Sequence, residues 1–248
     1  MKFNRRLTFS EELGNTITHG VMAAATLVLL PIGSLWGYFH GGYASAVGIS
    51  IFIASLFLMF LSSTLYHSMY HNSKHKSIFR ILDHIFIYVA IAGSYTPVAL
   101  VIIGGWKGIL IVIIQWTIVL VGILYKSLAT RAMPKLSLTL YLVMGWIAIF
   151  FFPTLLRRAN TVFLVLVVLG GVMYSIGAYF FAHDYKKYYH MIWHIFINIA
   201  AILHIIGIGF FLYRKWKKVK NNSLLSKFLN NKKSRIRCKS GNSLRSDT

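Results

Sequence analysis

The sequence is poor in charged residues, above all in acidic ones. Charged side chains make up 12% of its 248 residues, and only five residues are acidic. A soluble domain typically carries about 25% charged residues, whereas hydrophobic residues here reach 57%. Several apolar runs are roughly 20 residues long, the length that a helix needs to cross a bilayer. The composition therefore predicts an integral membrane protein, and the first run is too long for a cleavable signal peptide.

Cysteine is almost absent. The single cysteine, Cys238, lies in a polar C-terminal stretch. One thiol cannot form a disulfide within the chain, and it cannot build a thiolate metal site. Any metal would have to be bound by nitrogen and oxygen ligands. Proline is also scarce: Pro31 and Pro97 fall within apolar runs, where kinks are tolerated in a membrane.

The apolar runs predict an all-α integral membrane protein, a seven-transmembrane-helix bundle. Thr8 followed by Glu11 forms a capping-box pattern, so either a short amphipathic helix or a helix that extends the first span should begin there. The expected organisation is an N-terminal segment (1–16), a membrane domain (17–213) and a basic tail (214–248). The expected spans are roughly 17–38, 43–66, 79–102, 107–126, 136–153, 161–182 and 190–213.

The basic residues are distributed unevenly. The N-terminus and the loops on its side carry eleven Lys and Arg residues, and the opposite loops carry three. Cytoplasmic loops are enriched in such residues, so we expect a multi-pass cell-membrane protein with a cytoplasmic N-terminus and an outside C-terminus. The tail conflicts with this orientation, because it carries twelve basic residues. Its expected partner is anionic lipid headgroups, not nucleic acid; its composition is typical of disorder.

Polar residues recur at the ends of three predicted spans. Ser63 and His67 are four residues apart, as are His190 and His194, so each pair shares one helix face. Asp83 is the only acid between Glu12 and Asp184. Seven antiparallel spans bring His67, Asp83 and the later histidines to the same depth in the membrane. We therefore expect these residues to form one site.

Three imidazoles with one open position are typical of a catalytic zinc site. Asp83 and Ser63 would then orient a bound water or a ligand. Histidines that hydrogen-bond within the bundle, a proton path and a bis-histidine haem are alternatives. His19 lies on the same face of the first span and could line the site, together with Asn15. His204 is too far along its helix to share the metal, and we expect it to hydrogen-bond within the bundle.

Seven stretches resemble one known family. They are EELGNTITHG, SSTLYHS, ILDHIFIYVAIAGSYTPVAL, GGWKG, LYLVMGW, GGVMYSIGA and HMIWHIFINIAAILH. Together they look like the bacterial hemolysin III family, which is grouped with the progestin and adipoQ receptors. The resemblance covers roughly residues 8–213, all seven spans in order, and excludes the tail.

The resemblance implies a zinc ion near the cytoplasmic face. The zinc ligands of the adiponectin receptors fall on His67, His190 and His194, with the associated Asp and Ser on Asp83 and Ser63. It also implies a link to membrane fluidity and lipid homeostasis. Three functions stay open: a zinc-dependent hydrolase of lipid amides or esters, similar to alkaline ceramidases; a non-enzymatic membrane sensor or regulator with structural zinc; and a pore-forming cytolysin. The sequence identifies neither a substrate nor an oligomeric state.

Overall fold

The structure, a computed structural model, describes residues 6–128 and 134–212. This part of the chain is helical and contains no strand, and it has seven helical segments long and apolar enough to cross a membrane. The predicted seven-helix bundle is therefore confirmed. The elements are α1 Phe9–Gly41, α2 Tyr43–Ser68, α3 Lys74–Pro97, η1 Val98–Ile103, α4 Gly105–Leu128, α5 Pro134–Trp146, α6 Ala148–Arg158, α7 Thr161–Ala182, α8 Tyr189–Ile206 and η2 Gly207–Phe211.

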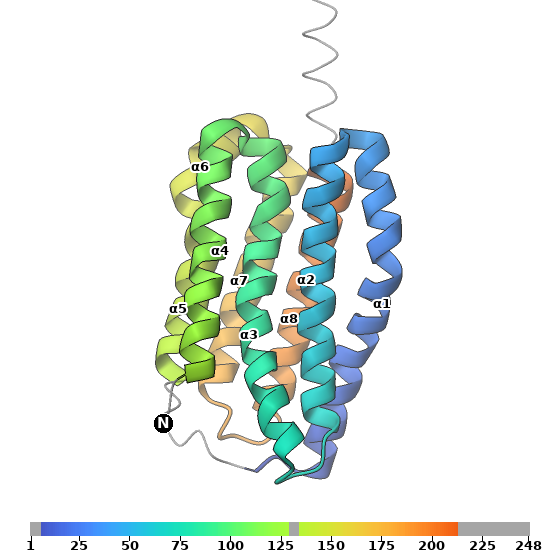
Figure 1. Cartoon of the computed structure of the whole chain (residues 1–248), viewed down its shortest axis with the longest axis vertical. Helices are drawn as coiled ribbons and strands as arrows, with labels where there is room; N and C mark the ends of the chain where they lie inside the picture. Colours follow the sequence, from blue (N-terminus) through green and yellow to red (C-terminus); the bar gives the residue numbers. More distant parts are fainter. Residues whose placement is uncertain (1–5, 129–133, 213–248) are drawn as a thin grey trace, which may run out of the picture.

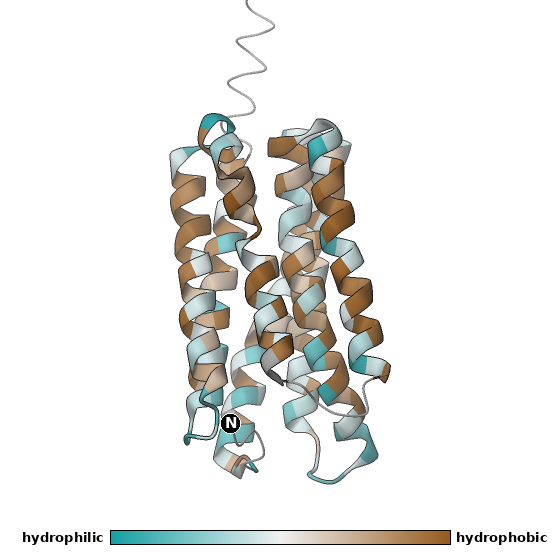
Figure 2. Cartoon of the chain, turned by 90° about the vertical axis from the view of Figure 1, so that its left-hand side faces the viewer, coloured by the Kyte–Doolittle hydropathy of each residue, from teal (hydrophilic) through white to brown (hydrophobic). Residues whose placement is uncertain are grey.

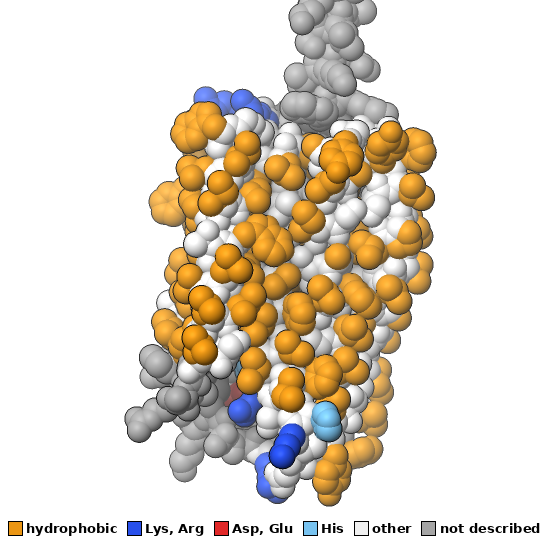
Figure 3. Space-filling view, viewed as in Figure 1, with side chains coloured by type: hydrophobic (Ala, Val, Ile, Leu, Met, Phe, Trp, Pro, Cys, Tyr) orange, Lys and Arg blue, Asp and Glu red, His pale blue; other side chains and the backbone are white. Residues whose placement is uncertain are grey.

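The helices run up and down as one bundle (Figure 1). The first four helices pack in sequence order, and α8 packs between α7 and α1, so the last span returns to the first. Hydrophobic residues dominate the middle of the bundle, and hydrophilic ones gather at its two ends (Figure 2). The face seen in Figure 3 is covered by hydrophobic side chains, with Lys and Arg confined to its ends. This distribution is that of a protein whose sides contact lipid.

The first helix begins eight residues earlier than the hydropathy of its span predicts. Thr8 caps it: the Thr8 side chain accepts from the Glu11 N–H, and the Glu11 carboxylate accepts from the Thr8 N–H at 2.9 Å. This is the expected capping box, and it carries Glu11 and Glu12 into the first turn of α1. The predicted tail, residues 214–248, lies outside the described residues.

The fifth span is broken into α5 and α6 at Ile147, a break that the sequence analysis did not predict. The Tyr95 hydroxyl donates to the carbonyl of Gly145 at 2.7 Å and accepts from the N–H of Ala148 at 2.9 Å. In a membrane, freed backbone groups must find partners inside the protein. One tyrosine from α3 thus satisfies both sides of the break.

Candidate metal centre

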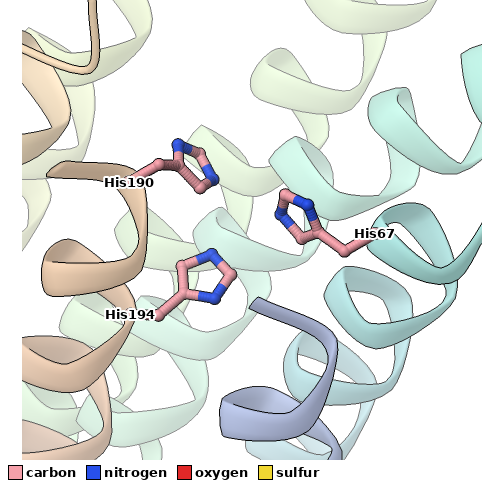
Figure 4. Close-up of side chains that lie close together, drawn as sticks. All are labelled: His67, His190 and His194. Atoms are coloured by element: carbon pink, nitrogen blue, oxygen red, sulfur yellow. The ribbon is translucent and has the colours of Figure 1, made fainter. Parts of the chain in front are cut away.

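Three histidine rings point toward one another at one end of the bundle (Figure 4). His67 comes from the last turn of α2, and His190 and His194 come from the first turns of α8. Each ring offers one nitrogen, and these three nitrogens all lie within 4.8 Å of one another. The structure therefore brings together the three predicted metal ligands, across 123 residues of sequence from His67 to His190.

Four ring nitrogens of this cluster lack a protein partner among the described residues. Within the described residues, Nε2 of His67, Nε2 of His190 and both nitrogens of His194 are buried and make no hydrogen bond. A buried polar atom left without a partner costs about 1–3 kcal/mol. Coordination of a metal ion would satisfy one nitrogen of each ring. The cluster therefore fits a metal bound by imidazole, although its geometry does not select one first-row metal over another.

Ser63 and Asp83 lie beside the cluster, as their positions in the sequence predicted. Ser63 is one turn before His67 and is 1% exposed, and Asp83 is 5% exposed. The Asp83 carboxyl is close enough to Ser63 and His67 to interact electrostatically with both. The Ser63 hydroxyl is buried next to that carboxyl. The predicted roles of these two side chains stay predictions.

Asn15 and His19 of α1 complete the surroundings of the histidines. The Asn15 amide nitrogen lies 3.4 Å from Nδ1 of His67. The His19 ring stacks on that of His194 and is 2% exposed. His204, by contrast, hydrogen-bonds through Nε2 to the carbonyl of Val167 at 3.2 Å. The structure thus confirms the expected positions of all three residues.

The sequence analysis did not predict that a carboxylate from α1, that of Glu12, contacts this site. Oε2 of Glu12 lies 2.6 Å from Nδ1 of His67, and its Oε1 lies 2.7 Å from Nζ of Lys76. A signal was available: Glu12, Asn15 and His19 follow the spacing i, i+3, i+7, which puts all three on one helix face.

A large apolar cavity adjoins the histidines. Its volume is about 570 Å³. Its walls come from α1, α2, α3, α5, α6, α7 and α8, and from the π-helices η1 and η2 that follow α3 and α8. His19, which stacks on His194, lines it, and so does Asp83. It reaches Ile103 at the far end of the third span and His204 of α8, about 15 Å along the helix from His194. The cavity therefore connects the polar site to the apolar middle of the bundle.

Comparison with known proteins gives a consistent result. A family model described as Haemolysin-III related matches residues 7–205. The chain is 36% identical to Hemolysin-3 of Bacillus cereus over 212 residues, which is 85% of this chain and 96% of the relative. It is 37% identical to a Hemolysin-3 homolog of Bacillus subtilis (strain 168) over 190 residues, covering 77% and 89% of the two chains.

A human protein is also similar. The chain is 31% identical to the monocyte to macrophage differentiation factor of Homo sapiens over 179 residues, which is 66% of this chain and 70% of that one. The matched region of the family model contains all seven spans up to residue 205, together with the three clustered histidines. This chain is therefore a multi-pass membrane protein that belongs to the haemolysin-III-related family.

Proposed function

We propose that this protein is a zinc-dependent hydrolase of lipid esters or amides that acts in membrane lipid homeostasis. One observation carries the proposal: a buried cluster of three histidines adjoins a large apolar cavity. Asp83 is the only acidic residue in the described wall of that cavity. Residues that could bind a metal and a residue that could act as a general base thus lie beside a cavity that could take a lipid.

Zinc is the metal that we propose for this ligand set. Three imidazoles with a fourth position open to substrate are typical of catalytic zinc. His67, His190 and His194 would hold the ion, and a site built from several thiolates is excluded because the chain has a single cysteine, Cys238. When bound there, zinc would polarise a carbonyl group and activate a water molecule as a nucleophile.

The cavity suits an acyl chain. Ligand pockets usually measure about 300–1,000 Å³ and are mostly apolar, and this cavity lies within that range. Its polar end, at His19 and Asp83, would take the ester or amide group. The apolar walls along α3, α7 and α8 would take the hydrocarbon and exclude bulk water from the reacting atoms.

The side chains around the histidines supply the remaining steps. Asp83 accepts a proton from the attacking water at a carboxylate oxygen, and the water oxygen forms a bond to the carbonyl carbon. The Ser63 hydroxyl donates a hydrogen bond to the negative charge that develops on the carbonyl oxygen. Asp83 then returns its proton to the leaving oxygen or nitrogen as that bond breaks. The products are a carboxylic acid and an alcohol or amine.

We also propose that the end of the bundle carrying the histidines faces the cytoplasm. This orientation is supported by the excess of basic residues in the loops at that end. Membrane lipids are the proposed partners, with anionic headgroups against the basic tail and no nucleic acid. A dedicated pore has less support, because Asp83 is the only charged residue in the described wall of the cavity, histidines apart.

The test combines metal analysis with a lipid panel on detergent-purified full-length protein. We expect one zinc per chain in the wild type, loss of zinc in His190→Ala, and retained zinc without turnover in Asp83→Asn. Ser63→Ala should lower turnover. Ser62→Ala is the matched control, because within the described part of the chain the Ser62 hydroxyl donates to the backbone carbonyl of Met59 in its own helix.

Two results would count against this function. Folded wild type that binds no zinc would overturn both the metal and the hydrolase. Wild type with one zinc per chain that cleaves no ester or amide across the panel would instead support a regulator in which zinc is structural.

A further inference from the structure

The Glu12 side chain is buried between His67 and Lys76, which belong to two other helices. The residue is 8% exposed, although it lies in the first turn of α1. One carboxylate oxygen, Oε2, lies 2.6 Å from Nδ1 of His67 at the end of α2. The other, Oε1, lies 2.7 Å from Nζ of Lys76 at the start of α3. A single carboxylate therefore joins the ends of three helices directly beside the metal cluster.

The bond to His67 determines which ring nitrogen carries the proton. An ionised carboxylate only accepts hydrogen bonds, so Nδ1 of His67 must be the donor. Nε2 is then left with a free lone pair, which is the form that binds a metal. Nε2 is also the His67 nitrogen that is buried without a partner among the described residues. Glu12 thus holds the ring in the tautomer that a ligand requires.

Lys76 holds the carboxylate in turn. Its ammonium group donates to Glu12 and also to the carbonyl of Met69 at 3.1 Å. It further lies over the ring of Tyr66, 5.0 Å from the centroid. The Lys76 residue is 8% exposed. These contacts leave the ammonium little freedom, and its positive charge balances the buried carboxylate.

We infer that Glu12 is a positioning residue for the metal site: it orients His67 and fixes its metal-binding tautomer, and Lys76 holds Glu12 in place. This inference rests on the metal of the proposed function but not on hydrolysis. Carboxylates that accept from a metal-bound histidine raise the basicity of the ligand, and their loss typically weakens metal binding about 10–100-fold.

Cobalt(II) gives a readout that does not depend on activity. Metal-free full-length protein in detergent is titrated with Co²⁺, and the visible absorption bands of the bound ion are recorded. Zinc affinity is then measured by competition. We expect Glu12→Ala to weaken binding by roughly 10–100-fold. Glu12→Gln should weaken it less, because the amide oxygen still accepts from Nδ1, and Lys76→Met should also weaken it.

Two neighbouring residues provide matched controls. Glu11→Gln removes a carboxylate charge one residue away from Glu12, and the Glu11 carboxylate accepts from the backbone N–H groups of Thr8 and Tyr188. Lys74→Met removes an exposed ammonium from the same helix end as Lys76. Both controls should bind Co²⁺ with an affinity within about threefold of the wild type, well short of the loss that a missing carboxylate partner causes.

The outcomes separate this inference from the proposed function. Wild type that shows no cobalt bands overturns the metal site as a whole. Wild-type Co²⁺ affinity in folded Glu12→Ala and Lys76→Met, in a protein that does bind Co²⁺, overturns only the positioning role. An equal loss of Co²⁺ affinity in Glu11→Gln and Glu12→Gln would also overturn the positioning role, because the loss would then follow from the missing charge and not from the contact with His67.

Discussion

The rings of His19 and His194 lie face to face, with their centroids 3.6 Å apart and their planes 3° from parallel. His19 also meets Phe60 edge-on, at 5.1 Å between centroids. Neither nitrogen of His19 has a partner among the described residues, and His19 is not one of the three clustered ligands. The ring therefore packs against His194 from one side, and we expect His19 not to be a ligand of the proposed metal.

Two substitutions of His19 distinguish the packing of its ring from any role of its nitrogens as metal ligands. We expect His19→Phe to keep the stack, the zinc and a melting temperature close to that of the wild type. His19→Ala removes the ring and leaves a void beside His194, which should cost on the order of 2–5 kcal/mol. Thermal unfolding and metal content of the purified variants check both expectations. Loss of zinc from folded His19→Phe would make His19 a fourth ligand and contradict this account.

Removing the metal should destabilise the bundle. A ligand present at a hundredfold its Kd stabilises the folded state by about 2.7 kcal/mol, which corresponds to roughly 5–10 °C in melting temperature for a chain of this size. We expect a chelator to lower the melting temperature of the wild type by that amount, and added Zn²⁺ to restore it. His194→Ala should show no such response. An equal response in this variant would mean that zinc acts at another site.

Close packing of α2 against α3 makes one glycine intolerant of substitution. A Cβ atom at Gly48 would lie 2.9 Å from the Cα atom of Pro97, and backbone cannot move aside as a flexible side chain can. We expect Gly48→Ala to destabilise the protein by about 1–3 kcal/mol. Gly171→Ala is the control, since its Cβ would meet nothing within 4 Å. Unfolding of both variants at the wild-type temperature would contradict the close approach of Gly48 to Pro97.

The single cysteine makes the orientation directly measurable. With the histidine end in the cytoplasm, Cys238 should react with a membrane-impermeant maleimide added to intact cells. In a Cys238→Ser background, Ser77→Cys introduces a thiol at an exposed position near the start of α3. This thiol should react only after the membrane is permeabilised. The reverse pattern would show that the basic tail, and not the loops, sets the orientation.

The sequence predicted much of the fold because the membrane imposes strong constraints on it. Apolar runs of the required length identified all seven spans, and alternation of direction brought His67 to the depth of His190 and His194. Depth alone does not fix rotation about a helix axis. The contact between Glu12 and His67 depends on how α1 and α2 are turned toward each other, and that follows from side-chain packing along both helices.

The break in the fifth span was missed for a different reason. Hydropathy is continuous across Ile147, so no composition change marks the end of α5. The break is stabilised by the Tyr95 hydroxyl from α3, a contact between residues about fifty positions apart. The cavity was likewise beyond prediction, because its walls come from seven helices whose gaps depend on the packing of every side chain.

The position of the three histidines along the chain has a consequence for how the protein is made. His67 lies on the second span to be synthesised, and His190 and His194 lie on the last. A ribosome-bound chain that has inserted only α1 to α7 contains just one of the three clustered histidines, His67. Uptake of the proposed metal would therefore be a late step of biogenesis, and an occupied site would indicate that the last helix has packed against the first ones.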